Sequence, residues 1–155
     1  MRHGKSSWEY PVDDRDRPLL ERGINDAYLI GKHFESQNIT IDQAYSSPAN
    51  RALHTAMIFL RETNFSLSKF QVTEQLYDFT GDSVMRFIKA LDDIHDSAAI
   101  FGHNYAFTHI VNMMGNDYID NLSTAGLVEI HFQIENWSKA LNGITKQTIL
   151  PKQLR

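Results

Sequence analysis

Short apolar segments of strand type alternate along the chain with segments of helical periodicity, and this alternation limits the possible folds more than any other feature. Apolar residues recur at helical spacing over residues 21–37, and residues 42–46 follow as a short strand. The same pairing returns later, where the apolar run 97–101 precedes a helix that closes at Gly115. The pattern predicts a three-layer α/β/α sandwich with a mainly parallel central sheet.

The other elements are predicted from local signals. Ser47 as N-cap and Pro48 at the first helical position favour a helix start. We expect the run 97–101 to be a central strand covered on both faces, because it does not alternate with polar residues. The remaining predicted elements are a strand over Phe70–Tyr77, a helix carrying Val84, Phe87, Ile88, Leu91 and Ile94, and strands over 127–134 and 144–150.

Composition excludes several classes of protein. The 155 residues fit a single domain, 1–155, and the net charge of −4 with no Lys/Arg-rich run opposes a nucleic-acid surface. The absence of cysteine removes disulfides, thiolate nucleophiles and cysteine metal sites. Neither a signal-peptide pattern nor an apolar run long enough for a bilayer is found, so we expect no membrane partner and a cytoplasmic location.

Polar residues collect where the predicted strands end. Arg2-His3, Tyr77-Asp78 and His103 each follow a strand, and Arg51 lies in the first turn of the helix that follows the strand at 42–46. In α/β sheets, ligands bind at the carboxyl ends of the strands. We therefore expect two arginines and two histidines to meet at one edge of the sheet.

This set of residues is suited to binding an oxyanion such as phosphate. Arginine binds phosphate oxygens with two parallel hydrogen bonds, and a helix N-terminus adds free N–H groups. A neutral imidazole near pH 7 can also accept a phosphoryl group covalently. The arginines and His103 could stabilise the charge without a metal, and no HExxH-type spacing is found.

The ordered motifs resemble the histidine phosphatase superfamily, which has the phosphoglycerate-mutase-like fold, and most closely its small SixA-like phosphohistidine phosphatases. The resemblance covers nearly the whole chain, through RHGKSSW, DRPLLERG, AYSSPANRALHTA, GHNYAFTHIVNMMG and WSKALNG…ILPKQL. It implies that His3 is the phosphorylated nucleophile and that Arg2, Arg51 and His103 bind the phosphoryl oxygens. No cofactor and no metal are implied.

Other roles follow less directly from the resemblance. Asn104 and Lys5 lie beside motif residues and are expected to line the pocket. Larger members of the family use a carboxylate after the third strand to protonate the leaving group, and here the candidates are Asp78 and Glu74. A phosphohistidine substrate needs such an acid less, because its leaving imidazole takes up a proton near neutral pH.

The chain departs from the family pattern in two places. The RHG motif of the family follows a hydrophobic strand, whereas only Met1 precedes Arg2 here, so we expect the first strand to be truncated. Leu20 stands where a Ser or Thr cap is usual before the first helix, which weakens that cap.

Several polar residues have simpler structural interpretations. Asp13, Asp14 and Asp16 are expected to form a solvated loop rather than a metal site, with Asp16 or Arg17 in a structural ion pair. Five histidines are expected to be structural or exposed: His33, His54, His95, His109 and His131.

Three functions remain open on the sequence. The first is a metal-independent phosphatase that acts through phospho-His3 on a phosphohistidine protein or a small phosphate ester. The second is a phosphoglycerate-type mutase, which would need a site that excludes water. The third is a non-catalytic module that binds phosphate or a phosphoprotein. A variant lacking His3 that still binds phosphate but does not turn over would separate the enzymes from the module.

Overall fold

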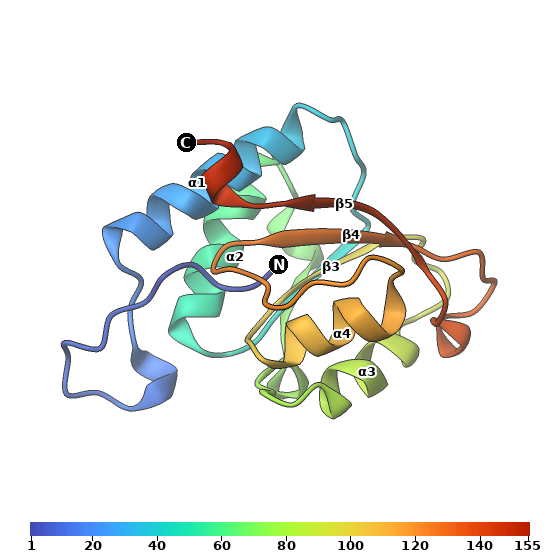
Figure 1. Cartoon of the computed structure of the whole chain (residues 1–155), viewed down its shortest axis with the longest axis horizontal. Helices are drawn as coiled ribbons and strands as arrows, with labels where there is room; N and C mark the ends of the chain where they lie inside the picture. The colour runs from blue at the N-terminus through green and yellow to red at the C-terminus, as the bar shows by residue number, and fades with distance from the viewer.

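Five strands and four helices follow one another in the expected order in the computed structural model, which describes all 155 residues (Figure 1). In chain order they are α1 (Glu21–Glu35), β1 (Gln43–Ser46), α2 (Asn50–Glu62), β2 (Phe70–Val72), α3 (Asp82–Lys89), β3 (Ala98–Phe101), α4 (Ala106–Met114), β4 (Leu127–His131) and β5 (Ile144–Ile149). No helix is both long and apolar enough to span a bilayer.

The strands form two sheets rather than one. β2, β1 and β3 pair in parallel in the order β2-β1-β3, and β4 pairs with β5 in antiparallel fashion. The first residues of the chain lie between β3 and β4, where Arg2 forms a parallel bridge with Gly102. The carboxyl ends of the three parallel strands lie on the side of the sheet where this bridge is formed.

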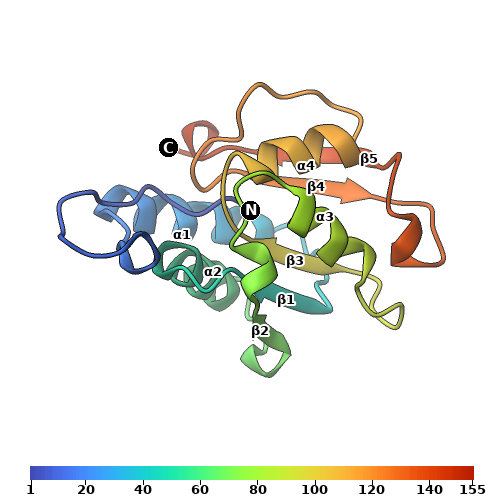
Figure 2. The ribbon, with the colours of Figure 1, turned by 90° about the horizontal axis from the view of Figure 1, so that it is seen from below.

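Helices cover both faces of the strands, which confirms the three-layer α/β/α prediction (Figure 2). Ala44, Phe101 and Leu127 pack into one core cluster with residues of α1 and α2. Their strand neighbours Tyr45, Ile100 and Val128 pack against a second cluster, built on α3 and α4. Successive side chains of a strand point to opposite faces, so each strand separates the two cores.

Some predicted boundaries are wrong. α2 begins at Asn50 with Ala49 at its N-cap, so Ser47 and Pro48 precede the helix. The strand predicted over Phe70–Tyr77 ends at Val72, because a 3-10 turn begins at Glu74. The helices α1 and α3 and the strand β4 are also shorter than predicted.

β3 is not covered as a central strand should be. Three of its four residues, Ala98 to Ile100, are only half-buried, and β1 is its only neighbouring strand. Both faces of β3 pack against helices as predicted, but the prediction of a central strand is wrong, because no strand lies beside it along most of its free edge.

Two glycines let the segment after His3 approach α1 closely. A Cβ atom on Gly23 would lie 2.2 Å from the carbonyl oxygen of Lys5, and one on Gly4 would lie 2.6 Å from that of Gly23. The backbone of α1 therefore supports the residues that follow the histidine.

Candidate active site

Backbone hydrogen bonds on both sides hold the first three residues in place. The N–H of His3 donates to the carbonyl of Gly102 at 3.0 Å, and the N–H of Arg2 donates to that of Gly126 at 3.0 Å. The N–H of Gly4 donates to Oγ1 of Thr55 in α2 at 2.9 Å. The RHG segment is thus anchored at the carboxyl edge of β3 and next to α2.

The hydrogen bonds of the His3 side chain define its protonation. Nδ1 lies 2.7 Å from the carbonyl oxygen of Gly4, and Nε of Arg51 lies 3.3 Å from Nε2. A carbonyl oxygen only accepts and a guanidinium only donates, so Nδ1 carries the proton and Nε2 keeps its lone pair. Burial, followed by the charges of Arg51 and Arg2, lowers the pKa of His3 to about 4.

Arg51 lies in the first turn of α2 and is almost fully buried, with 2% of its surface exposed. Besides its contact with His3, its Nη2 forms an ion pair with Oδ2 of Asp14 at 2.9 Å, and its Nη1 donates to the Asp14 carbonyl. The guanidinium is therefore held across the N-terminal end of α2, where partial positive charge already favours anions.

His103 follows β3 and faces the first histidine. The centroids of the His3 and His103 rings are 5.3 Å apart, and Nε2 of His103 lies 2.7 Å from Oγ of Ser47. Burial, followed by the repulsion of His3 and Arg51, lowers the pKa of His103 to about 3. Both imidazoles are thus neutral at pH 7.

Two polar atoms of the site lack a hydrogen-bond partner. They are Nε of Arg2 and Nδ1 of His103, and both are buried. The rest of the Arg2 guanidinium is anchored, because Nη1 donates to the carbonyl of Leu122 at 2.7 Å. Buried polar atoms without a partner are costly, so an anion at this position would satisfy groups that the chain leaves unpaired.

Asp14 belongs to this site, which the sequence did not indicate. Its carboxylate accepts hydrogen bonds from Arg51 at 2.9 Å, from Arg17 at 3.1 Å and from the hydroxyl of Tyr77 at 2.7 Å. Burial alone would raise the pKa of Asp14, but the hydrogen bonds from Tyr77 and Arg51 and the charge of Arg51 hold it well below its usual range. The expectation of a solvated loop is wrong for this residue, whereas the ion pair expected for Arg17 is confirmed.

The carboxylate of Asp78, a candidate general acid, is hydrogen-bonded to backbone N–H groups. Its Oδ2 accepts from the N–H groups of Gly81 at 3.0 Å and Val84 at 3.1 Å, and its Oδ1 accepts from that of Thr80 at 3.0 Å. Burial raises the pKa of Asp78, but these backbone hydrogen bonds outweigh it and lower the pKa. The carboxylate caps the start of α3, and a carboxylate held ionised in this way is a poor proton donor.

The remaining predicted residues lie at the margin. Lys5 is exposed, and Glu74 pairs with Arg15 on the surface at 2.7 Å. The side chain of Asn104 is hydrogen-bonded to Asn121 and Thr108. The five histidines expected to be structural or exposed are half-buried or exposed in the structure: His33, His54, His95, His109 and His131.

Aromatic side chains form an exposed rim. The ring of Phe79 lies 4.9 Å from that of His103, centroid to centroid, and 41% of Phe79 is exposed. Trp8 is exposed on the loop after the RHG segment, and the guanidinium of Arg17 lies 3.3 Å above its ring. No group of three or more His, Cys, Asp or Glu side chains is arranged to hold a metal ion.

Known proteins resemble this chain in sequence. The sequence pattern of the histidine phosphatase superfamily (branch 1) matches residues 1–85. An uncharacterized protein of Mycobacterium tuberculosis is 31% identical over 103 residues, which is 66% of this chain and 62% of that protein. A 2,3-bisphosphoglycerate-dependent phosphoglycerate mutase of Methylorubrum extorquens is 38% identical over 64 residues, 39% of this chain and 30% of the mutase. This chain thus spans about three fifths of the mycobacterial protein.

Solved structures share the fold. The protein histidine phosphatase SixA in complex with tungstate superposes with a TM-score of 0.85 at 21% identity, over 100% of this chain and 97% of SixA. SixA from Agrobacterium tumefaciens gives a TM-score of 0.82 at 22% identity, over 97% and 95% of the two chains. At this identity the likeness establishes the fold. Together with the sequence match over more than half of its residues, it places the chain in the histidine phosphatase superfamily.

Proposed function

We propose that this chain is a metal-independent phosphatase in which Nε2 of His3 accepts the phosphoryl group. One observation carries the proposal: Nδ1 of His3 is fixed as a donor to the Gly4 carbonyl, so Nε2 carries the lone pair that attacks phosphorus, and the hydrogen bond that this nitrogen accepts from Nε of Arg51 is long, at 3.3 Å. The low pKa of the ring keeps this nitrogen unprotonated well below pH 7.

Arg2, Arg51 and His103 are the proposed ligands of the phosphoryl oxygens. Arg51 uses one N–H toward His3 and two toward Asp14, which leaves two of its five donors for an anion. Nε of Arg2 and Nδ1 of His103 have no other partner. Fixed donors around the transferred group supply most of the catalysis that phosphoryl transfer requires.

The reaction has two steps. The Nε2 lone pair forms a bond to phosphorus while the bond from phosphorus to the leaving group breaks, and the leaving group departs with that electron pair and takes up a proton. Water then attacks phosphorus, the P–N bond breaks, and its electrons return to Nε2 while the water gives up a proton. Inorganic phosphate is released, and His3 is restored.

A phosphohistidine side chain on a protein is the substrate that the proton balance favours. Asp78 is occupied at the start of α3 and Glu74 pairs with Arg15, so neither candidate acid is free to donate a proton. A leaving imidazole has its own affinity for a proton near pH 7 and therefore needs no strong acid. The exposed rim with Trp8 and Phe79 gives a protein surface room to approach.

A phosphoglycerate-type mutase is the second candidate, favoured by the 38% identity to the mutase from Methylorubrum extorquens. A mutase keeps its phosphoryl group on the histidine and passes it to a second substrate, which requires that water be excluded. The Asp14 side chain is 40% exposed, and the aromatic rim is exposed as well. Water can therefore reach the site, which favours hydrolysis over transfer to a second substrate.

Hydrolysis of a phosphohistidine peptide and of p-nitrophenyl phosphate, with a chelator present, tests the proposal. The chain and its His33→Ala control are expected to turn over the peptide, whereas His3→Ala is expected to bind phosphate without turnover. Activity in His3→Ala would refute the proposal. Transfer to phosphoglycerate that exceeds hydrolysis would favour the mutase.

A further inference from the structure

The side chain of Ser47 is fully buried directly after β1, next to His103. The N–H of Ser47 donates to the carbonyl of Phe101 at 3.0 Å, which holds the serine against the end of β3. His103 follows the end of β3 closely, and its Nε2 lies 2.7 Å from Oγ of Ser47. Two neighbouring strands therefore fix the distance between the hydroxyl and the imidazole.

The hydroxyl of Ser47 has a hydrogen-bond partner on each side. Pro48 has no N–H, so the first backbone donor after the serine is Ala49, whose N–H donates to Oγ of Ser47 at 3.2 Å. The oxygen is an acceptor in this contact and still carries a proton of its own. Nε2 of His103 is the second partner, so it is the atom available to accept a hydrogen bond from the hydroxyl.

The proton of the His103 imidazole can be on either ring nitrogen. A neutral histidine has one N–H and one lone pair, and burial keeps His103 neutral at pH 7 by lowering its pKa. A proton on Nε2 would leave the hydroxyl proton of Ser47 without an acceptor and the lone pair of Nδ1 without a donor. A proton on Nδ1 leaves only that N–H unpaired. Because buried polar atoms without a partner are costly, the tautomer with the proton on Nδ1 is favoured.

We propose that Ser47 is a positioning residue that holds His103 in the tautomer with the proton on Nδ1. The ring then presents an N–H to the phosphoryl group, whereas the other tautomer would present a lone pair, which repels an anion. This role in phosphate binding rests on the proposed function, in which the unpaired Nδ1 of His103 binds a phosphoryl oxygen. Ser47 acts through the imidazole and does not itself contact the reacting atoms.

Aromatic rings pack against His103 but do not select its tautomer. The ring of Tyr77 meets the imidazole edge-on at 5.4 Å, centroid to centroid, and that of Phe79 lies at 4.9 Å. The hydroxyl of Tyr77 donates to Asp14, and Phe79 has no polar side-chain atom. These rings hold the plane of the imidazole, so the choice between its two nitrogens depends on Ser47.

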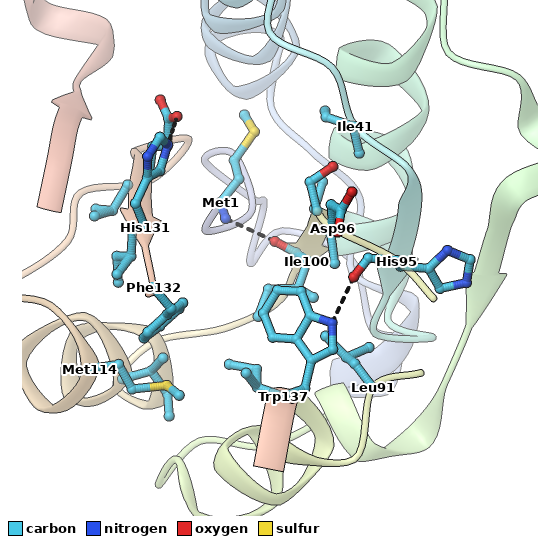
Figure 3. Close-up of a pocket in the computed structure, with 18 of the residues that line it drawn as sticks. Met1, Ile41, Leu91, His95, Asp96, Ile100, Met114, His131, Phe132 and Trp137 are labelled. Atoms are coloured by element: carbon cyan, nitrogen blue, oxygen red, sulfur yellow. Dashed lines mark hydrogen bonds and ion pairs between the residues drawn. The ribbon is translucent and has the colours of Figure 1, made fainter. Parts of the chain in front are cut away.

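The largest cavity of the molecule does not reach this imidazole. It has a volume of about 680 Å³ and lies between β3 and β4, where Ile100, Phe132 and Trp137 line it (Figure 3). Neither Ser47 nor His103 belongs to its wall. Solvent in this cavity therefore does not pair with Nδ1, and the N–H is left for a ligand at the candidate active site.

Two-bond proton–nitrogen correlation NMR of the isotope-labelled chain near pH 7 tests the proposal directly. The signals of His103 are identified by their absence from the spectrum of His103→Asn. Nδ1 is expected at the chemical shift of a protonated ring nitrogen, and Nε2 at that of an unprotonated one. The reverse pattern would overturn the proposal.

Ser46→Ala is the matched control for Ser47→Ala. Both serines are fully buried, but Oγ of Ser46 donates to the backbone carbonyl of Ser47 at 2.9 Å and forms no hydrogen bond with the imidazole. Ser47→Ala is expected to weaken the binding of inorganic phosphate by about 10-fold and to move the proton of His103 partly to Nε2, because the hydroxyl no longer favours Nδ1. Ser46→Ala should retain the phosphate affinity and the proton pattern of the unaltered chain.

Equal phosphate affinities and equal proton patterns in the two variants would also overturn the proposal. Failure of the proposed function gives a different result. A chain with Nδ1 protonated that binds phosphate but does not hydrolyse a phosphohistidine peptide would keep the role of Ser47 and contradict the phosphatase. Turnover of the peptide by a chain with Nε2 protonated would keep the phosphatase and overturn the role of Ser47.

Discussion

Arg51 joins the proposed nucleophile to the loop ahead of α1, because its Nε donates to His3 and its Nη2 pairs with Asp14. A guanidinium that is 2% exposed needs such partners, since a buried charge without one is strongly destabilising. The planar fork also fixes where the two remaining donors point, which a lysine could not reproduce. Asp14 therefore orients the arginine without touching the reacting atoms.

Asp14→Asn tests this positioning role. The loss of the ion pair is expected to lower kcat/KM for p-nitrophenyl phosphate by roughly 10-fold to 100-fold, because a small displacement of an oriented group has an effect of that size. Asp16→Asn, on the same short turn but without an ion pair, should leave kcat/KM nearly unchanged. Equal effects of the two substitutions on kcat and on KM would show that Asp14 does not orient Arg51.

Single residues were predictable where strand order and motif agreed. Arg2, His3, Arg51 and His103 were expected at one edge of the sheet, and the structure places them there. Asp14 could not be selected, because three aspartates stand close together in DDRD and only the tertiary fold brings one of them to Arg51. The use of Asp78 at the start of α3 likewise depends on how the chain turns between Phe79 and Gly81.

At the scale of elements, α3 depends on Asp78 because its own N-cap residue, Gly81, has no side chain to bind the first turn. Asp78→Ala is expected to lower the free energy of unfolding by about 1 kcal/mol, a typical value for a lost cap. The midpoint of thermal unfolding should fall by roughly 2–4 °C for a chain of this size, with little change in kcat. A collapse of kcat at an unchanged midpoint would instead restore Asp78 as the general acid.

The elements themselves were largely predictable, since hydrophobic period distinguishes helices from strands over windows of this length. Helix α2 begins two residues later than predicted, because Oγ of Ser47 lies 2.7 Å from Nε2 of His103 and the chain enters the helix at Ala49. β3 is apolar enough for a buried strand, yet it lies at a free edge. The apolar pattern of a segment does not show whether the strand lies at the centre or at the edge of its sheet.

At the scale of the whole molecule, two neutral histidines in the interior make stability depend on pH. The pKa values of His3 and His103 are lowered by folding to about 4 and about 3, so the unfolded chain binds more protons than the folded one as pH falls below about 6.5. Folding is therefore expected to lose roughly 2 kcal/mol per histidine between pH 6.5 and 5.

Urea unfolding at several pH values between 7.5 and 5 measures this loss. His103→Asn removes one of the two groups and should flatten the dependence, whereas His54→Asn, a substitution on the exposed face of α2, should follow the unaltered chain. A free energy of unfolding that is constant over this range would contradict the assignment of two buried neutral imidazoles.

In the proposed reaction, His3 carries the phosphoryl group during turnover. The most direct test is rapid quenching of the unaltered chain with substrate under alkaline conditions, followed by mass spectrometry of the N-terminal peptide. One acid-labile phosphoryl group is expected on His3, forming within a turnover and disappearing as substrate is consumed. Turnover with no phosphoryl group on His3, or with one on another residue, would contradict it.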